Sequence, residues 1–486
     1  MSRAGSAGHP VWRRDGICGR ATAAPGPQAG HRRRARQQRA PRAGGALRVT
    51  VRTAAARVLD RALASRSPTD IFLDQASTDL DERDRRLLRE LVFGTLRWLR
   101  RLDQVIGSAA IRPLSEIDPP LHAPLRLAVY QLLYLDRIPP HAAVNEAVEE
   151  AHRRTHKGGA SFVNAVLRRI AKQPRLEAWP ITETDPTARL AIESSHPDFL
   201  VARWLDRFGE ARTRELVAAN NRPKPLHLLA FEDRGGRERL TETLANEDVE
   251  TEPSSLSPLG LVARGGNPVD TDAFARGDFY LQDEASQVSA LLPAPAAGEV
   301  ILDAAAAPGG KSFALLAAQP AVTVYANELS VARLGTLRAN IVRLGRRLPL
   351  VAADASSPPF SCSFDRVVVD LPCTGTGTLR KHPELKWRVS PEELARLSRQ
   401  AGKLLAGVAP LVRPGSLLVA ITCSLEPEEN ERVAEAFLAD NQDFSPHDFA
   451  TEISAPLSGM ITGPGSWQIL PAGDHDGFTV QVLRRS

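Results

Sequence analysis

The chain has 486 residues, of which 43% are hydrophobic, so two to four domains with ordinary globular cores are expected. It contains no apolar run long enough to span a membrane and no apolar segment of the kind that forms a secretory signal. The net charge of +5 is unevenly spread, because residues 1–48 hold eleven Arg and one acid and so carry +10, which leaves −5 for the rest. A nucleic-acid surface on the rest of the chain must therefore be a local patch.

Four cysteines are present, namely Cys18, Cys362, Cys373 and Cys423, and none forms a CxxC pair. In a chain of this length they do not make a disulfide framework. Free thiols fit a reducing, cytoplasmic setting, where they are candidates for chemistry. We expect a cytoplasmic monomer.

Residues 1–48 are rich in Arg, Ala and Gly and show no periodicity. Such a segment cannot bury a core, so a disordered basic tail is predicted. This tail could contact RNA or direct the chain to an organelle. The alternative is a dispensable tail, or sequence upstream of the true start.

Residues 49–178 predict an all-helical domain. Apolar residues recur at helical spacing between Leu88 and Ile106 and form a core-facing stripe. Further helices are expected at 125–133, 143–155 and 162–170, with breaks at Pro139–Pro140 and Gly158–Gly159. The helix that carries this stripe has another face that could bind RNA or could simply be solvated. That face carries Arg86, Arg89, Phe93, Arg97 and Arg100.

His152 and His156 lie four residues apart, which is a metal-ligand spacing on a helix. No third ligand is evident, so we expect no metal. Residues 174–186 predict a linker by their Pro and Thr content. Residues 187–280 are expected to form a small connecting α+β unit, helical as far as about residue 221.

Residues 281–486 alternate strand and helix patterns, which is typical of a doubly wound, Rossmann-like α/β domain with a parallel sheet. The expected strands are 300–303, 322–325, 350–353, 367–370 and 417–421. In such a sheet the ligand binds beyond the carboxyl ends of the strands. Candidate functional residues are therefore sought where each strand ends.

The loop after the first of these strands reads Ala305-Ala306-Ala307-Pro308-Gly309-Gly310-Lys311. Its two glycines allow close backbone approach to a ligand and lead into a helix N-terminus. It is neither GxGxxG nor a P-loop, and a tight structural turn is the alternative. The acids Glu328, Asp354 and Asp370 stand at the ends of the next three strands; singly they often only cap helices, but together they predict a nucleoside pocket.

Two cysteines stand out by their position. Cys373 follows Asp370-Leu371-Pro372, and Cys423 lies in Thr422-Cys423-Ser424 at the end of the fifth strand. A lone cysteine is more often inert than nucleophilic, and Cys18 and Cys362, which do not follow a strand end, are interpreted as incidental. If the fourth and fifth strands are neighbours, however, Cys373 and Cys423 can face one pocket.

Two thiols suit methylation of carbon 5 of cytosine. A thiolate that adds to carbon 6 makes carbon 5 able to attack an electrophilic methyl group. A second thiol can promote release of the product. Asp370 in a protonated state could stabilise the adduct at N3 of the base.

Residues 281–486 closely resemble RNA cytosine-C5 methyltransferases of the bacterial Sun/RsmB type. The resemblance lies in Gln282–Ser286, the 305–311 loop, Asp370–Cys373, Arg380–Pro383 with Lys386-Trp387, Thr422–Ser424, Pro427–Asn430 and Asp476–Phe478. It implies that Cys423 is the nucleophile and that Cys373 assists release. It also implies S-adenosylmethionine as cofactor, held by residues 305–311, Glu328, Asp354 and Asp370.

Residues 49–178 resemble the helical RNA-binding domain of the NusB antitermination factor, at Asp84–Leu99 and Phe162–Arg168. This domain ahead of that catalytic domain is typical of the bacterial enzyme that acts on small-subunit ribosomal RNA. The resemblance therefore implies 16S rRNA as the partner. The chain departs from the family at Ala305, where Cys is frequent, and at Leu371 and Asn327, which concerns cofactor contacts rather than the reaction.

Rival functions are distinguished by the same motifs. An amino-methyltransferase would carry [DN]PP[YFW] after the fourth strand, where this chain has Asp370-Leu371-Pro372-Cys373. A DNA cytosine-C5 enzyme needs only the first cysteine as its nucleophile, so Thr422-Cys423-Ser424 argues against it. A silent RNA-binding or assembly protein would be favoured by loss of either cysteine, and both are present.

Overall fold

A computed structural model describes residues 50–486 of the chain. The basic tail expected at 1–48, which includes Cys18, lies outside the described residues. Residues 49–486 cluster as one unit, so contacts between the domains within it are part of its structure.

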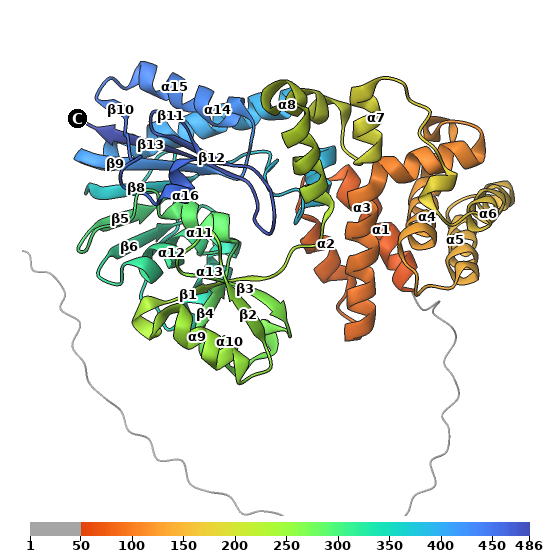
Figure 1. The fold of residues 1–486 in the computed structure, drawn as a ribbon, viewed down its shortest axis with the longest axis horizontal. Coiled ribbons are helices and arrows are strands. Elements are labelled where there is room, and N and C mark those ends of the chain that lie inside the picture. Colours follow the sequence, from red (N-terminus) through yellow and green to blue (C-terminus); the bar gives the residue numbers. More distant parts are fainter. Residues whose placement is uncertain (1–49) are drawn as a thin grey trace, which may run out of the picture. The chain divides into compact units, whose positions relative to one another are not determined.

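The N-terminal domain is all-helical, as predicted (Figure 1). Its helices are α1 (Val51–Ala64), α2 (Thr69–Ala76), α3 (Glu82–Ala110), α4 (His122–Tyr134), α5 (Pro140–Arg154) and α6 (Lys157–Ala171). Helix α3 begins where the Asp81 carboxylate accepts a hydrogen bond from the backbone N–H of Asp84. The predicted apolar stripe is its core face, and Leu88 and Ile106 at its ends are fully buried.

Two predicted helix boundaries were wrong. Gly158 and Gly159 do not break a helix but lie in the first turn of α6, because His156 Nδ1 accepts a hydrogen bond from Gly158 N–H at 3.1 Å and caps that turn. Helix α5 begins at Pro140 rather than Ala143, since proline suits the first helical position, where no N–H is needed. His156 is thus an N-cap, and residues 50–486 hold no group of three side chains that could bind a metal.

The connecting domain is α+β, as predicted. It contains α7 (Pro186–Glu193), α8 (Asp198–Asn221), α9 (Gly236–Ala245), α10 (Asp272–Arg276) and strands β1 (His227–Ala230), β2 (Glu250–Pro253), β3 (Gly260–Gly265) and β4 (Phe279–Leu281). The four strands form an antiparallel sheet in the order β2-β3-β1-β4. Its core side chains include Leu228, Leu261 and Phe279.

The C-terminal domain is built on a large sheet in the order β11-β12-β13-β9-β8-β5-β6-β7, with β10 paired to β13. Its strands are β5 (Val300–Asp303), β6 (Thr323–Asn327), β7 (Leu350–Val351), β8 (Phe364–Asp370), β9 (Val412–Thr422), β10 (Phe444–Pro446), β11 (Ile461–Gly463), β12 (Ser466–Ile469) and β13 (Phe478–Arg485). The strands from β7 to β9 are parallel, as predicted, but β13, β12 and β11 are antiparallel. The sheet is therefore mixed: β11, β12 and β13 are joined to one another by short loops, which allow only antiparallel pairing, and β13 runs antiparallel to β9.

Helices cover both faces of this sheet (Figure 1). They are α11 (Glu284–Ala290), α12 (Gly310–Ala318), α13 (Val331–Leu344), α14 (Pro391–Val408), α15 (Glu431–Asp440) and α16 (Ala455–Ser458). Phe313 of α12 and Leu337 of α13 belong to the core on one face, and Leu405 of α14 and Phe437 of α15 to the core on the other. Short 3-10 helices connect the elements: η1 (Leu114–Glu116), η2 (Pro119–Leu121), η3 (Leu176–Ala178), η4 (Glu232–Arg234), η5 (Pro268–Asp270), η6 (Pro383–Trp387), η7 (Ala409–Leu411) and η8 (Pro427–Glu429).

Helix η6 joins the C-terminal domain to the N-terminal one. The fully buried Lys386 ammonium donates to Arg97 O at 3.1 Å, to Ser195 O at 3.2 Å and to Asn221 Oδ1 at 2.7 Å. The Trp387 indole N–H donates to the backbone oxygen of Leu96 in α3 at 2.8 Å. The segment that follows Cys373 is thereby held against α3.

The basic face of α3 contributes to this interface. Arg97 donates to the backbone oxygen of Arg380 at 3.0 Å, and Arg100 donates to the backbone oxygen of His196 at 2.9 Å. The guanidinium groups of Arg97 and Arg100 therefore have internal partners and are not simply solvated. Arg86 and Arg89 lie on the exposed part of the helix, where they pair with acids of the same domain.

Candidate active site

The two strands that carry the candidate cysteines are parallel neighbours. Asp370 of β8 lies opposite Ile421 of β9, and Leu371 N–H continues the ladder by donating to Ile421 O at 2.8 Å. The segments that follow β8 and β9 therefore leave the sheet at the same edge. The sulfur atoms of Cys373 and Cys423 lie 3.5 Å apart, which places both thiols at one site.

Backbone hydrogen bonds hold the two loops together. Gly377 N–H donates to Cys423 O at 2.9 Å, and Gly477 N–H donates to Gly377 O at 2.7 Å. A Cβ atom at Gly377 would lie 2.3 Å from the carbonyl oxygen of Gly477, so no larger residue fits there. The loops after β8 and β9 and the loop before β13 thus pack as one layer around the thiols.

The two thiols are not equivalent. The hydrogen bond with Cys373 lowers the pKa of Cys423, and the nearby Lys311 ammonium lowers it further against the effects of burial and Asp370. The same hydrogen bond raises the pKa of Cys373, and burial and the carboxylates of Glu429 and Asp370 add to it. The site therefore favours a Cys423 thiolate that accepts a hydrogen bond from the Cys373 thiol.

Lys311 and Asp370 form an ion pair beside the cysteines, with Lys311 Nζ 2.6 Å from Asp370 Oδ2. Burial works against the charge of Lys311, but the pair with Asp370 outweighs it and raises the pKa of the ammonium. The ammonium group also lies 5.3 Å from the centre of the Phe478 ring. The Asp370 carboxyl group thus lies between a cation and the two thiols.

The 305–311 loop joins β5 to α12 as predicted. Gly309 has φ +116°, and a Cβ atom there would lie 2.3 Å from the Phe313 ring, so only glycine fits the turn. The turn directs the N-terminus of α12 toward the carboxyl edge of the sheet, where Asp370 and the thiols lie. Part of the loop is buried, but Gly310 and Lys311 at the start of α12 are partly exposed, which leaves this end of the helix accessible to a cofactor.

Polar groups at the ends of β6 and β7 complete this part of the site. Asn327 donates to Ala304 O and to Ala353 O, each at 3.0 Å, and so ties three strand ends together. Glu328 is buried, and its Oε2 accepts no hydrogen bond among the described residues, although Arg333 pairs with it at 3.3 Å. Oε2 of Glu328 and Oδ1 of Asn327, which is likewise without a hydrogen bond, are acceptors suited to ribose hydroxyls.

The remaining candidates, Asp354 and Cys362, are exposed. Asp354 is exposed, and its Oδ1 accepts a hydrogen bond from Ser356 N–H at 2.8 Å, so it caps a turn after β7. Cys362 is exposed and free. Within 50–486, no helix has the length and apolarity that a membrane span requires.

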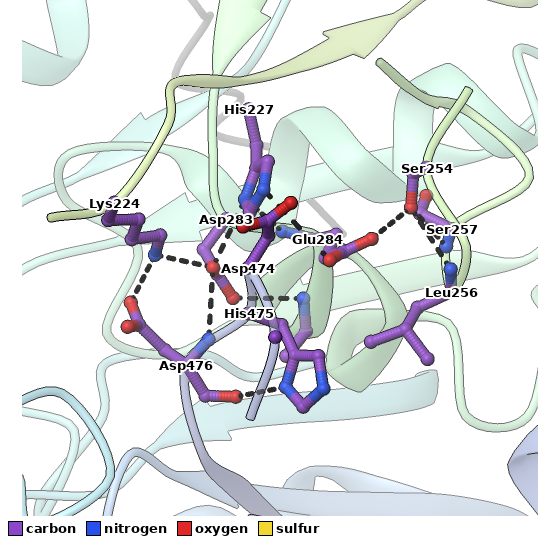
Figure 2. Close-up of polar contacts among 12 residues, drawn as sticks. Lys224, His227, Ser254, Leu256, Ser257, Asp283, Glu284, Asp474, His475 and Asp476 are labelled. Carbon is purple, nitrogen blue, oxygen red and sulfur yellow. Dashed lines mark hydrogen bonds and ion pairs between the residues drawn. The ribbon is translucent and has the colours of Figure 1, made fainter. Parts of the chain in front are cut away.

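Figure 2 shows a buried ion cluster that was not predicted from the sequence. It includes Asp476, which precedes the Gly477 that donates to Gly377 in the active site. The Lys224 ammonium lies between the carboxylates of Asp283 and Asp476, 2.5 Å from Asp476 Oδ2. Asp283 caps α11 and also accepts from Asp476 N–H at 3.2 Å. Burial opposes its charge, but His227 and Lys224 outweigh burial and hold the pKa of Asp283 well below its usual range.

This cluster connects the connecting domain to the loop that supports Gly377. The motifs Gln282–Ser286 and Asp476–Phe478 were noted in the sequence, but their meeting through Lys224 was not. A lysine that follows a Pro in a segment without periodicity carries no local signal of a buried ion pair. Only the packing of three distant segments reveals it.

Three segments of the chain match known families. Residues 290–484 match the family described as 16S rRNA methyltransferase RsmB/F. Residues 49–172 match the NusB family, and residues 196–270 match the RsmF/B-like ferredoxin-like domain. Each match lies inside one of the segments expected from the sequence.

Relatives match most of the chain. The ribosomal RNA small subunit methyltransferase B of Pseudomonas syringae pv. tomato is 35% identical over 88% of this chain and 95% of its own length. The probable ribosomal RNA small subunit methyltransferase B of Bacillus subtilis is 34% identical over 84% of this chain and 92% of its own. The crystal structure of PH0851 has the same fold, with a TM-score of 0.72 and 24% identity over 89% of this chain and 98% of that one.

Proposed function

The chain belongs to the RsmB/F family of 16S rRNA methyltransferases, and from this premise we propose that it methylates carbon 5 of a cytosine in 16S rRNA through a covalent adduct with Cys423. It is an rRNA methyltransferase whose methyl donor is S-adenosylmethionine. The observation that carries the proposal is the pair of thiols 3.5 Å apart beyond β8 and β9. A thiol that adds to carbon 6 supplies the activation that carbon 5 lacks.

The residues beside the thiols fit the methyl donor. Residues 305–311 would hold it at the N-terminus of α12, and Glu328 would accept hydrogen bonds from its ribose hydroxyls. When bound, S-adenosylmethionine supplies an electrophilic methyl group. Asp370, at the end of β8, would be a further contact to the methyl donor. Asp354 would contact the donor from an exposed turn.

Glu328→Ala is expected to weaken cofactor binding by about tenfold or more, because a hydrogen bond to a charged group contributes roughly 1.5–3 kcal/mol. Isothermal titration with S-adenosylhomocysteine measures the change. Asp354→Ala is the matched comparison, and its effect is expected to be smaller because that side chain is exposed. Equal losses in the two variants would contradict the assignment of the ribose contact to Glu328.

Cys423 begins the proposed reaction as a thiolate. Its sulfur forms a bond to carbon 6, and the electrons of the carbon 5–carbon 6 double bond become available at carbon 5, which takes the methyl group. Asp370, which lies beside the thiols at the end of β8, would form a hydrogen bond with the base at N3. The base must first leave its stack, at a cost of a few kcal/mol that is smallest in a loop.

Cys373 completes the reaction. Once Cys423 is bonded to carbon 6, the thiolate whose hydrogen bond raised the pKa of Cys373 no longer exists. Cys373 can then lose its proton to water and accept the proton from carbon 5. The electron pair left behind restores the double bond, the carbon 6–sulfur bond breaks, and Cys423 leaves as a thiolate.

The direct test is to incubate the protein with 16S rRNA and labelled S-adenosylmethionine, then digest the RNA and identify the nucleoside by mass spectrometry. We expect 5-methylcytidine, and none with Cys423→Ala. Naked rRNA and partly assembled small subunits serve as parallel substrates. A methyl group at another atom, or none with either substrate, would overturn the proposal.

We further propose that the chain acts as a cytoplasmic monomer. The three cysteines among residues 50–486 are free thiols, which fits a reducing compartment. Light scattering of the purified protein tests the oligomeric state. A mass of twice the 52.7 kDa chain would contradict it.

A further inference from the structure

We propose that Glu429 determines which of the two thiols carries the proton: its buried carboxylate keeps Cys373 in the thiol form and leaves the negative charge to Cys423. Glu429 is then a positioning residue, because it acts through Cys373 and not on the base. The inference rests on the proposed two-thiol chemistry and adds to it a residue that touches neither the base nor the methyl donor.

The geometry ties Glu429 to the residue next to Cys373. Glu429 ends η8 and is fully buried. Its Oε1 accepts a hydrogen bond from Thr374 N–H at 2.8 Å, and its Oε2 accepts one from Thr374 Oγ1 at 2.7 Å. Both carboxylate oxygens of Glu429 therefore accept hydrogen bonds from the turn that carries Cys373. These two bonds fix the orientation of that turn.

Charges of opposite sign act on the two thiols. The cation Lys311 acts on Cys423, and its charge favours a thiolate there. The carboxylate of Glu429 acts on Cys373, where its charge disfavours a thiolate. Asp370 is an anion toward both sulfurs, so it does not distinguish them. Lys311 and Glu429 therefore reinforce the difference that the hydrogen bond between the two sulfurs establishes.

The surroundings of Glu429 contain few other charges. Burial raises its pKa to about 7, and the carboxylate of Glu426 acts in the same direction, although Arg203 pairs with Glu426 at 2.8 Å. The helices packed around the small cavity that Glu429 lines contribute apolar side chains, Leu405 from α14 and Val433 from α15. The charge of Glu429 is consequently present above about pH 7 and lost below it.

This placement serves both halves of the reaction. Before attack, a protonated Cys373 donates its hydrogen bond to Cys423, so that one sulfur alone is nucleophilic. After attack, the charge of Glu429 makes the ionised Cys373 a stronger base toward the proton on carbon 5. The same carboxylate thus prevents Cys373 from competing as nucleophile and supports its later role.

Glu429→Gln tests the inference, because the amide oxygen can still accept from Thr374 N–H while the charge is removed. The rate of iodoacetamide labelling of each cysteine is followed by peptide mass spectrometry at pH 6 and pH 8.5, on the full chain without RNA. At pH 8.5 we expect Cys373 to be labelled about tenfold faster in the variant than in the wild type, as a lowering of one pKa unit would give. At pH 6 the two proteins should agree, because wild-type Glu429 is then neutral.

Glu428→Gln is the matched control, since Glu428 is the preceding residue in η8 and pairs with Arg203 and Arg432 rather than with Thr374. It should leave both labelling rates unchanged. An unchanged Cys373 rate in Glu429→Gln at pH 8.5 would overturn the inference. So would faster labelling of both cysteines at both pH values, which would mean that Glu429 only holds the loop closed. Labelling requires no methyl transfer, so either result is separate from whether wild type forms 5-methylcytidine.

Discussion

Cys373→Ala is expected to leave the protein covalently attached to rRNA, whereas Cys423→Ala should form no attachment. Attack at carbon 6 needs only the Cys423 sulfur, so the adduct still forms without Cys373 and the methyl group is still transferred. Without the second thiol, 3.5 Å from the first, no side-chain sulfur accepts the carbon 5 proton, and the carbon 6–sulfur bond persists. The difference should be nearly all-or-none on a denaturing gel after incubation with rRNA and S-adenosylmethionine.

The exposed Cys362 supplies the control for this experiment. Cys362→Ala should show wild-type methylation and no retained adduct. An adduct with Cys423→Ala and none with Cys373→Ala would exchange the two roles. Because Cys423→Ala also removes the hydrogen-bond partner of Cys373, its thermal unfolding should be compared with that of the wild type.

Lys386→Met is expected to lower the free energy of unfolding by about 3 kcal/mol, because it leaves three buried oxygen acceptors without their donor. These acceptors belong to α3, to Asn221 at the end of α8 and to the backbone of Ser195. Burial and the charge of Arg97 lower the pKa of Lys386, which shows that the lysine is retained at an electrostatic cost. Activity should fall as well, since η6 belongs to the segment that follows Cys373.

Differential scanning calorimetry and urea denaturation measure this effect. Lys381→Met is the matched control, because Lys381 lies in the same segment and is exposed. Limited proteolysis should also cut the Lys386 variant between α6 and α8 sooner than the wild type. Equal stability of the two variants would contradict the role of Lys386 as a bond between the domains.

Local pattern was sufficient for most of the fold. The stripe from Leu88 to Ile106 became the buried face of α3 because helical periodicity is a property of nearby residues alone. The strand ends also followed from local pattern, so Asp370, Cys373 and Cys423 could be placed at the carboxyl edge before their distance was known. The strands after residue 421, β10 to β13, were not predicted, and their antiparallel direction could not have been, since an apolar run has the same composition in parallel and antiparallel sheets.

The sequence by itself determined the order of the domains, the sheet edge that bears the site and the identity of the two thiols, because each depends on residues close together in the chain. The tertiary structure decided which charged side chains from distant parts of the sequence come into contact. It paired Lys311 with Asp370, enclosed Lys224 between two carboxylates and placed Glu429 against the Cys373 turn. It also showed that Arg97 and Arg100 have internal partners, where the helical pattern alone could not distinguish an interface from a solvent-exposed face. Coulombic interactions depend on separation in space, and separation along the sequence does not predict it.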